Sequence, residues 1–200
     1  MTVVETDRIA MADESDESDK LTLDSLFESL EAMPVPEGYK VEIVGGTITM
    51  SPQRDTHWTI IRRIVRALED RFGMDVAVLS DVRIDFPGHL NGFAPDVVKL
   101  ADGAKKDASG RWNPSDARFI AEVLSRSTAV NDHGPKKTAY ATASVPVYLI
   151  VDPYVRRCHV YTEPKDGEYT VDRTVKFGQE IDLTGTDIDL VLKTDGFPRD

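Results

Sequence analysis

Cysteine is almost missing from this chain of 200 residues, in which Cys158 stands alone. A single cysteine excludes an intramolecular disulfide and a zinc site built from several cysteines. Such sparing use of cysteine is typical of proteins in a reducing compartment, so we expect a cytoplasmic protein.

Long hydrophobic runs are missing as well. No apolar stretch approaches the ~20 residues that a membrane helix needs, and mean hydropathy is −0.31. The first residues also lack a basic start followed by an apolar stretch, which argues against secretion. Hydrophobic residues still make up 40% of the chain, and a chain of this length suits one domain with its own core.

Basic residues are fewer than acidic ones, 24 against 35, so the formal net charge is −11. That balance excludes a protein that coats nucleic acid electrostatically. Residues 1–20 contain seven acidic and two basic residues and so hold five of the net negative charges. We therefore expect a disordered acidic tail over 1–20 and a single domain over 21–200. The tail is most simply a solubilising extension; the alternative is a regulatory arm that competes with a polyanionic ligand.

The remaining chain alternates between helix and strand patterns. A helix is expected from Leu23 to about Met33 with Thr22 as its N-cap, and another from Asp55 to Phe72 with Gly73 beyond its end. The stretch Tyr39–Met50 predicts a hairpin around Gly45-Gly46. Further strands are expected at 76–79, 82–86, 94–100, 118–124, 147–151 and 157–162, a helix from Pro135 to about Ala143, and edge strands over 168–193. The fold class is therefore α+β, or mixed α/β.

Three acids interrupt apolar strand patterns: Glu42, Asp96 and Glu122. A buried carboxylate is costly without a partner, and a metal ion explains several acids at one place. Oxygen ligands favour Mg²⁺ or Mn²⁺ over zinc. If the Asp96 and Glu122 strands are neighbours, their carboxylates can share one ion. The alternative for each acid is a sheet-edge position that faces solvent or caps a turn.

Five short motifs follow one another in a fixed order. They are Tyr39-x-Val41-Glu42-Ile43-Val44-Gly45-Gly46, Pro95-Asp96-Val97-Val98, Glu122-Val123-Leu124-Ser125-x-Ser127-Thr128, Asp132-x-Gly134-x-Lys136-x-x-x-Tyr140 and Val145-Pro146-x-Tyr148-x-Ile150-Val151-Asp152-Pro153. In this order the chain resembles, over about residues 21–161, the Uma-type family of restriction-endonuclease-like proteins, within the PD-(D/E)XK nuclease superfamily. The resemblance implies a restriction-endonuclease-like fold, a central mixed β-sheet flanked by helices with a metal site at one edge.

The resemblance assigns roles residue by residue. Asp96 matches the acid of the PD element, and Glu122 matches the acid of the (D/E)XK element. The superfamily's lysine position is Leu124 here, which departs from the pattern. A lysine that has migrated to the following helix would be Lys136.

Other residues complete the implied site. Glu42 matches the family's N-terminal glutamate, so the resemblance implies that it is an additional metal ligand, together with the main-chain carbonyl of Val123. Tyr140, four residues after Lys136, shares its helix face and could orient it.

The resemblance implies a Mg²⁺-dependent (or Mn²⁺-dependent) endonuclease that hydrolyses DNA, with Asp96, Glu122 and Lys136 as catalytic residues. Leu124 and the net acidity support an alternative: a catalytically inactive nuclease fold that serves as a nucleic-acid-binding or protein-interaction module. A metal-dependent hydrolase of another phosphoester is a third reading. DNA is the expected partner of an active enzyme, and a homodimer is expected only by analogy with enzymes that cut two strands.

Weaker candidates have simpler explanations. His57 could reach the site, but it also suits the start of a helix. Ser125, Ser127 and Thr128 could contact a phosphate, or could serve a loop and a helix cap. Asp152 before Pro153 is typical of a turn, and Cys158 of a small core residue. The face that carries Arg62, Arg63 and Arg66 could follow a nucleic-acid backbone or could simply be solvated.

Overall fold

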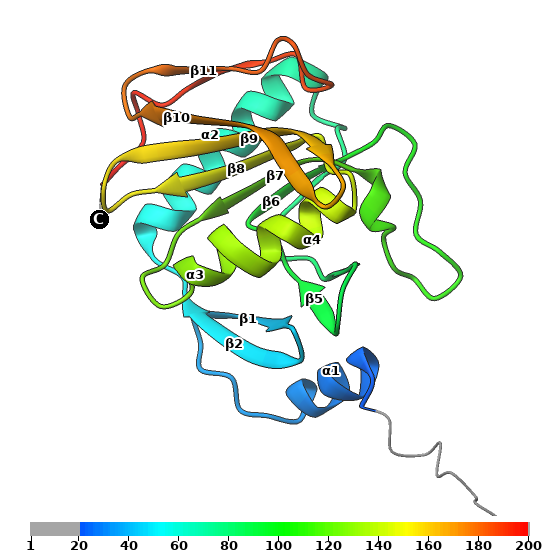
Figure 1. Ribbon diagram of the computed structural model, residues 1–200. Coiled ribbons are helices and arrows are strands. Elements are labelled where there is room, and N and C mark those ends of the chain that lie inside the picture. The colour runs from blue at the N-terminus through cyan, green and yellow to red at the C-terminus, as the bar shows by residue number, and fades with distance from the viewer. Residues whose placement is uncertain (1–20, 200) are drawn as a thin grey trace, which may run out of the picture.

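The computed structural model describes residues 21–199, so the predicted tail over 1–20 lies outside the described residues. A large mixed sheet has helices on both faces, and a smaller sheet lies beside one end of it (Figure 1). This arrangement confirms the predicted α+β class with a central mixed sheet.

The large sheet holds six strands, of which only β7 and β8 are parallel neighbours. The predicted buried run over 147–151 lies inside this sheet as β8, between β7 and β9. In spatial order the strands are β10 (Glu168–Lys176), β9 (Arg157–Lys165), β8 (Val147–Asp152), β7 (Ala117–Val123), β6 (Val97–Leu100) and β3 (Val78–Leu79).

The small sheet has the spatial order β2 (Thr47–Pro52), β1 (Tyr39–Val44), β5 (Asn91–Phe93) and β4 (Ile84–Phe86). The predicted hairpin is confirmed as β1 and β2, although β2 runs on through Pro52. Gly45 and Gly46 have φ of +58° and +78°, the left-handed values that a two-residue type I′ turn requires. The sequence did not predict β5, because three residues are too few to show alternation.

Two predicted helices are confirmed. Helix α1 (Leu23–Glu31) begins with a capping box between Thr22 and Ser25 and ends two residues before Met33. Helix α2 (Asp55–Phe72) has the expected bounds, and Gly73 follows it with φ of +94°.

The third helix starts earlier than predicted. It comprises α3 (Ala129–Asn131), a π-helical segment (Asp132–Lys136) and α4 (Lys137–Thr142). Pro135 is therefore inside the helix and not at its first position. Proline lacks an N–H and clashes with the carbonyl four residues before it in an α-helix, so a wider turn accommodates it.

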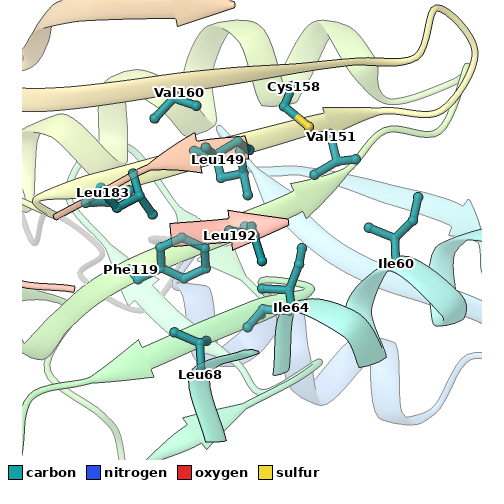
Figure 2. Packing of buried hydrophobic residues seen from close by; sticks show 14 of the residues in the cluster. Ile60, Ile64, Leu68, Phe119, Leu149, Val151, Cys158, Val160, Leu183 and Leu192 are labelled. Atoms are coloured by element: carbon teal, nitrogen blue, oxygen red, sulfur yellow. The ribbon is translucent and has the colours of Figure 1, made fainter. Parts of the chain in front are cut away.

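Two hydrophobic cores lie on opposite faces of the large sheet. Figure 2 shows Ile60, Ile64 and Leu68 of α2 packed against Phe119 and Leu149 of the sheet. The opposite face packs against α4 and the small sheet through Ile120, Tyr140, Tyr148, Phe86 and Phe93. Strand β7 contributes to both cores because successive side chains point to opposite faces.

The last strands, β11 (Glu180–Asp182) and β12 (Val191–Lys193), form a separate antiparallel pair. Several predicted strands are shorter than expected: residues 76–77, 82–83 and 94–96 lie outside β3, β4 and β6. A short 3₁₀ turn, Pro114–Asp116, lies between β6 and β7. Within the described residues, no helix combines the length and apolar character needed to cross a membrane.

Candidate functional site

Three separate parts of the fold bring the predicted acids and lysine together. Strands β6 and β7 are antiparallel, and Val97 pairs with Ala121. Asp96, directly before Val97, therefore lies beside Glu122, as expected if their strands are neighbours. Strand β1 of the small sheet contributes Glu42, and the π-helical segment contributes Lys136.

Lys136 is the centre of one ion-pair cluster. Its Nζ lies 2.6 Å from Glu122 Oε1, 3.0 Å from Glu42 Oε2 and 3.1 Å from Asp132 Oδ1. The residue is only 1% exposed, so Lys136 is not a solvated lysine on a helix surface. Asp132 was not predicted as a site residue, although its spacing of four from Lys136 places both on one helix face.

Lys40 is the second lysine of the site, and sequence reasoning missed it. Its Nζ lies 2.6 Å from Asp96 Oδ1, 3.3 Å from Glu122 Oε2 and 3.8 Å from Glu42 Oε2. The available signal was its position two residues before Glu42, because residues i and i+2 of a strand share a face.

Hydrogen bonds fix the orientation of the three predicted acids. The Val123 N–H donates to Asp96 Oδ2 at 2.7 Å, and the Ala94 N–H donates to Glu42 Oε1 at 2.8 Å. The Tyr140 hydroxyl donates to Glu122 Oε1 at 2.7 Å. Glu42, Asp96 and Glu122 are all buried, so none of them is the solvent-facing acid of the alternative reading.

The two central acids have opposite pKa shifts. Burial raises the pKa of Asp96, and this outweighs the pull of the Lys40 ammonium. Burial also acts on Glu122, but Lys136 and Lys40 together lower its pKa to about 2. Glu122 is therefore the more firmly ionised partner, because two ammonium groups act on it.

Burial alone would lower the pKa of both lysines, but the surrounding acids reverse that effect. Asp96, Glu122 and Glu42 raise the pKa of Lys40, and Asp132, Glu122 and Glu42 raise that of Lys136. Both side chains are thus ammonium ions at neutral pH. Burial raises the pKa of Asp132 to about 7, against the attraction of Lys136.

Side chains fill the site almost completely, leaving a cavity of about 10 Å³. His57 of α2 lines it and is buried, with Nε2 lying 3.1 Å from the Leu124 carbonyl oxygen. Ser125 and Thr128 line it as well, and their hydroxyl oxygens are 2.6 Å apart. His57 thus lies in the first turn of α2 and also lines the site.

The other candidates lie elsewhere. Arg62, Arg63 and Arg66 are exposed along a hollow of about 880 Å³ between α2 and β12, which acidic residues of α2 also line. Asp152 accepts hydrogen bonds from the Tyr154 and Val155 N–H groups and so forms the predicted turn. Cys158 is a buried core residue, as expected.

The acidic side chains of the site offer few ligands to a divalent ion. Over residues 21–199, no group of three or more His, Cys, Asp or Glu side chains is arranged to hold a metal ion. Asp96 and Glu122 nevertheless both contact one cation, the Lys40 ammonium. Two carboxylates fit Mg²⁺, which commonly takes one or two of them and completes its shell with water and substrate phosphate oxygens.

Comparisons with known proteins agree with this architecture. Residues 27–193 match the family model Uma2, whose description is "Putative restriction endonuclease". A solved structure from Anabaena variabilis ATCC 29413, described as "a putative nuclease belonging to DUF820", aligns with a TM-score of 0.67 at 14% identity. The alignment covers 89% of this chain and 97% of that one, which establishes a shared fold. No curated protein matches the sequence.

Proposed function

Because the chain belongs to the Uma2 family of restriction-endonuclease-like proteins, we propose that it is an endonuclease that hydrolyses DNA phosphodiester bonds with Mg²⁺ or Mn²⁺. The observation that carries the proposal is that buried Asp96 and Glu122 both contact the Lys40 ammonium, while buried Lys136 pairs with Glu122. Two neighbouring carboxylates can hold a divalent ion, and an ammonium group beside them can stabilise the negative charge that develops on a phosphate.

Asp96 and Glu122 are the proposed metal ligands, with the Val123 carbonyl and Glu42 as additional ones. When bound, the ion would polarise the scissile phosphate and lower the pKa of a bound water. The residues around the acids keep them in place. The Val123 N–H holds one oxygen of Asp96, and the Tyr140 hydroxyl holds one oxygen of Glu122.

Lys136 is the proposed third catalytic group. As an ammonium ion, Lys136 can position the attacking water by donating a hydrogen bond to the water oxygen. It can also stabilise the negative charge that grows on the phosphate oxygens as the new P–O bond forms and the old one breaks. Its contacts with Glu42 and Asp132 anchor it within the site.

Cleavage of plasmid DNA by the purified protein tests the proposal. We expect nicking or cutting with Mg²⁺ or Mn²⁺ and none in EDTA. Asp96→Ala and Glu122→Ala should each lower the rate by ~10²-fold or more, because each removes a ligand of the ion. Asp70→Ala is the matched control, since Asp70 is an exposed carboxylate paired with Arg66 on α2. Cleavage that persists in both site variants would contradict the assignment.

The second candidate is a metal-independent binding module with the same fold. The specific observation in its favour is the Lys40 ammonium, which already compensates the charge of Asp96 and Glu122. Fluorescence anisotropy with labelled DNA separates the two functions. Binding of equal strength in Mg²⁺ and in EDTA, without any cleavage, is expected of the module and not of the enzyme.

A cytoplasmic location is also part of the proposal, because a single buried cysteine suits a reducing compartment. A homodimer would place two sites on a duplex, one for each strand. Size-exclusion chromatography with light scattering checks the oligomeric state.

A further inference from the structure

Each of the two central acids, Asp96 and Glu122, has one carboxylate oxygen bonded to other groups of the protein and one that faces Lys40. Asp96 Oδ2 is held by the Val123 N–H, and Glu122 Oε1 is held by Tyr140 and Lys136. The other two oxygens, Asp96 Oδ1 and Glu122 Oε2, face the Lys40 ammonium at 2.6 and 3.3 Å. Glu122 Oε2 has one further contact, 3.4 Å from the Asp96 N–H. An ion that bridges the two acids would need these same two oxygens.

The cavity is too small for a second cation beside this ammonium. Its volume is about 10 Å³, near the lower limit of ~10–15 Å³ for a single water molecule. Two positive charges that share two oxygens would also repel each other strongly. A divalent ion and the Lys40 ammonium therefore exclude each other at this position.

Space for the displaced side chain exists next to the site. A hollow of about 300 Å³ is lined by Lys40 itself together with Tyr39, Gln53, Asp81 and Ala94. Burial raises the pKa of Asp81 to about 6, and the nearby Lys40 charge opposes that rise. The lysine stem has four flexible carbons, so the ammonium can move toward the Asp81 carboxylate without movement of strand β1.

We propose that Lys40 is a built-in competitor for the divalent ion. Its ammonium bridges Asp96 and Glu122 when no metal is bound, and it moves toward Asp81 when the ion takes its place. The identity of that ion rests on the proposed nuclease function. The exchange replaces one positive charge by two among four carboxylates, Glu42, Asp96, Glu122 and Asp132, and so favours the ion once its concentration is sufficient.

Isothermal titration calorimetry of Mg²⁺ into EDTA-stripped Lys40→Met protein tests the competition directly. We expect Kd for Mg²⁺ to fall roughly ten- to hundredfold relative to wild type, because the ion no longer displaces a charge-assisted hydrogen-bonded group. The matched control is Lys99→Met. Lys99 is also buried, but it lies at the other end of β6 and bonds to the Leu100 carbonyl oxygen. Its loss should leave Kd unchanged.

Thermal stability gives a second readout that needs no catalysis. In EDTA, Lys40→Met should melt at a lower temperature than wild type, because two buried carboxylates lose their cation. Added Mg²⁺ should restore much of that loss in Lys40→Met and little in Lys99→Met.

Asp81→Asn provides a surface variant that leaves the buried cluster intact. Removal of the outer partner should weaken Mg²⁺ binding several-fold in the wild-type background. A general charge effect of Asp81→Asn would weaken Mg²⁺ binding equally in the Lys40→Met background. The proposed exchange predicts no loss there, because that background has no Lys40 ammonium to move toward residue 81.

Two results would overturn the proposal. One is an unchanged Kd for Mg²⁺ in Lys40→Met, and the other is an equal effect of Asp81→Asn in both backgrounds. Failure of the proposed function has a different signature. If Lys40→Met binds Mg²⁺ more tightly but neither protein cleaves DNA, the competition stands and the nuclease assignment fails. If wild type cleaves DNA while Kd is unchanged in Lys40→Met, the reverse holds.

Discussion

The Tyr140 hydroxyl donates a 2.7 Å hydrogen bond to the ionised Glu122 carboxylate inside the protein. A hydrogen bond to a charged group contributes more than one between neutral groups. We therefore expect Tyr140→Phe to lower the free energy of unfolding by ~1.5–3 kcal/mol. Urea denaturation monitored by circular dichroism measures this loss.

Tyr148 supplies the matched control for that prediction. It is equally buried, but its hydroxyl donates to a neutral acceptor, the Asp132 carbonyl oxygen, at 3.0 Å. Tyr148→Phe should cost only ~0.5–1.5 kcal/mol. A larger loss in Tyr148→Phe than in Tyr140→Phe would contradict the assigned charge of Glu122.

Asp132 should make the stability of the protein depend on pH. Its pKa is raised to about 7 by burial, so the folded state binds this proton more tightly than the unfolded state does. Stability from this group is therefore present at low pH and is lost as pH rises toward 7. Relative to Asp132→Asn, wild type should gain ~1–3 kcal/mol between pH 7.5 and pH 5.

Denaturant titrations of the two proteins at several pH values check this sign. The difference between them isolates Asp132, because the other titrating groups are common to both. A constant difference across that pH range would show that Lys136 keeps the Asp132 carboxylate ionised in the folded protein.

At the scale of elements, the β1–β2 hairpin positions two site residues, Lys40 and Glu42. Its turn depends on Gly45, whose φ of +58° is left-handed and whose missing Cβ has open space around it. Gly45→Ala should therefore cost ~1 kcal/mol of stability through backbone strain alone. Thermal denaturation measures it. Gly185→Ala is the control, because that glycine also has open space but no left-handed φ, and it should be near neutral.

Elements with a long periodic pattern were predicted correctly from the sequence, and very short ones were missed. Helix α2 was predicted from Asp55 to Phe72 because eighteen residues give five turns of apolar periodicity. Strand β5 was missed because Asn91, Gly92 and Phe93 show no alternation. The helix start at Pro135 was wrong because a π-helical turn, which no short sequence pattern indicates, holds the proline inside the helix.

For the whole molecule, charge is the property with the clearest consequence. Residues 1–20 hold five of the eleven net negative charges and should repel a polyanion. We expect a chain that starts at Leu21 to bind DNA several-fold more tightly at low ionic strength. Anisotropy titrations at rising NaCl should show the difference disappearing as screening increases. A difference that persists at high salt would indicate a specific contact instead.

The site was predictable only where local sequence carried a signal. Glu42, Asp96 and Glu122 stood out because each interrupts an apolar strand, and Lys136 followed from the family resemblance. Lys40 and Asp132 carry only a weak signal, their spacing of two from Glu42 and of four from Lys136, which does not distinguish them from exposed charges. Their burial depends on the packing of the small sheet and the π-helical segment against β6 and β7, which is a tertiary effect.

The site joins two sheets that have no strand in common. Glu42 and Lys40 come from the small sheet, while Glu122 comes from the large one. Small sheets with few strands open more readily than the sheet that holds the main core. Amide hydrogen exchange should therefore reveal an opening in which β1 separates while β7 and β8 stay protected. In that opened form Asp96 and Glu122 would be exposed to solvent. The contact between the two sheets that buries the site would then also be the route by which solvent and ligands enter it.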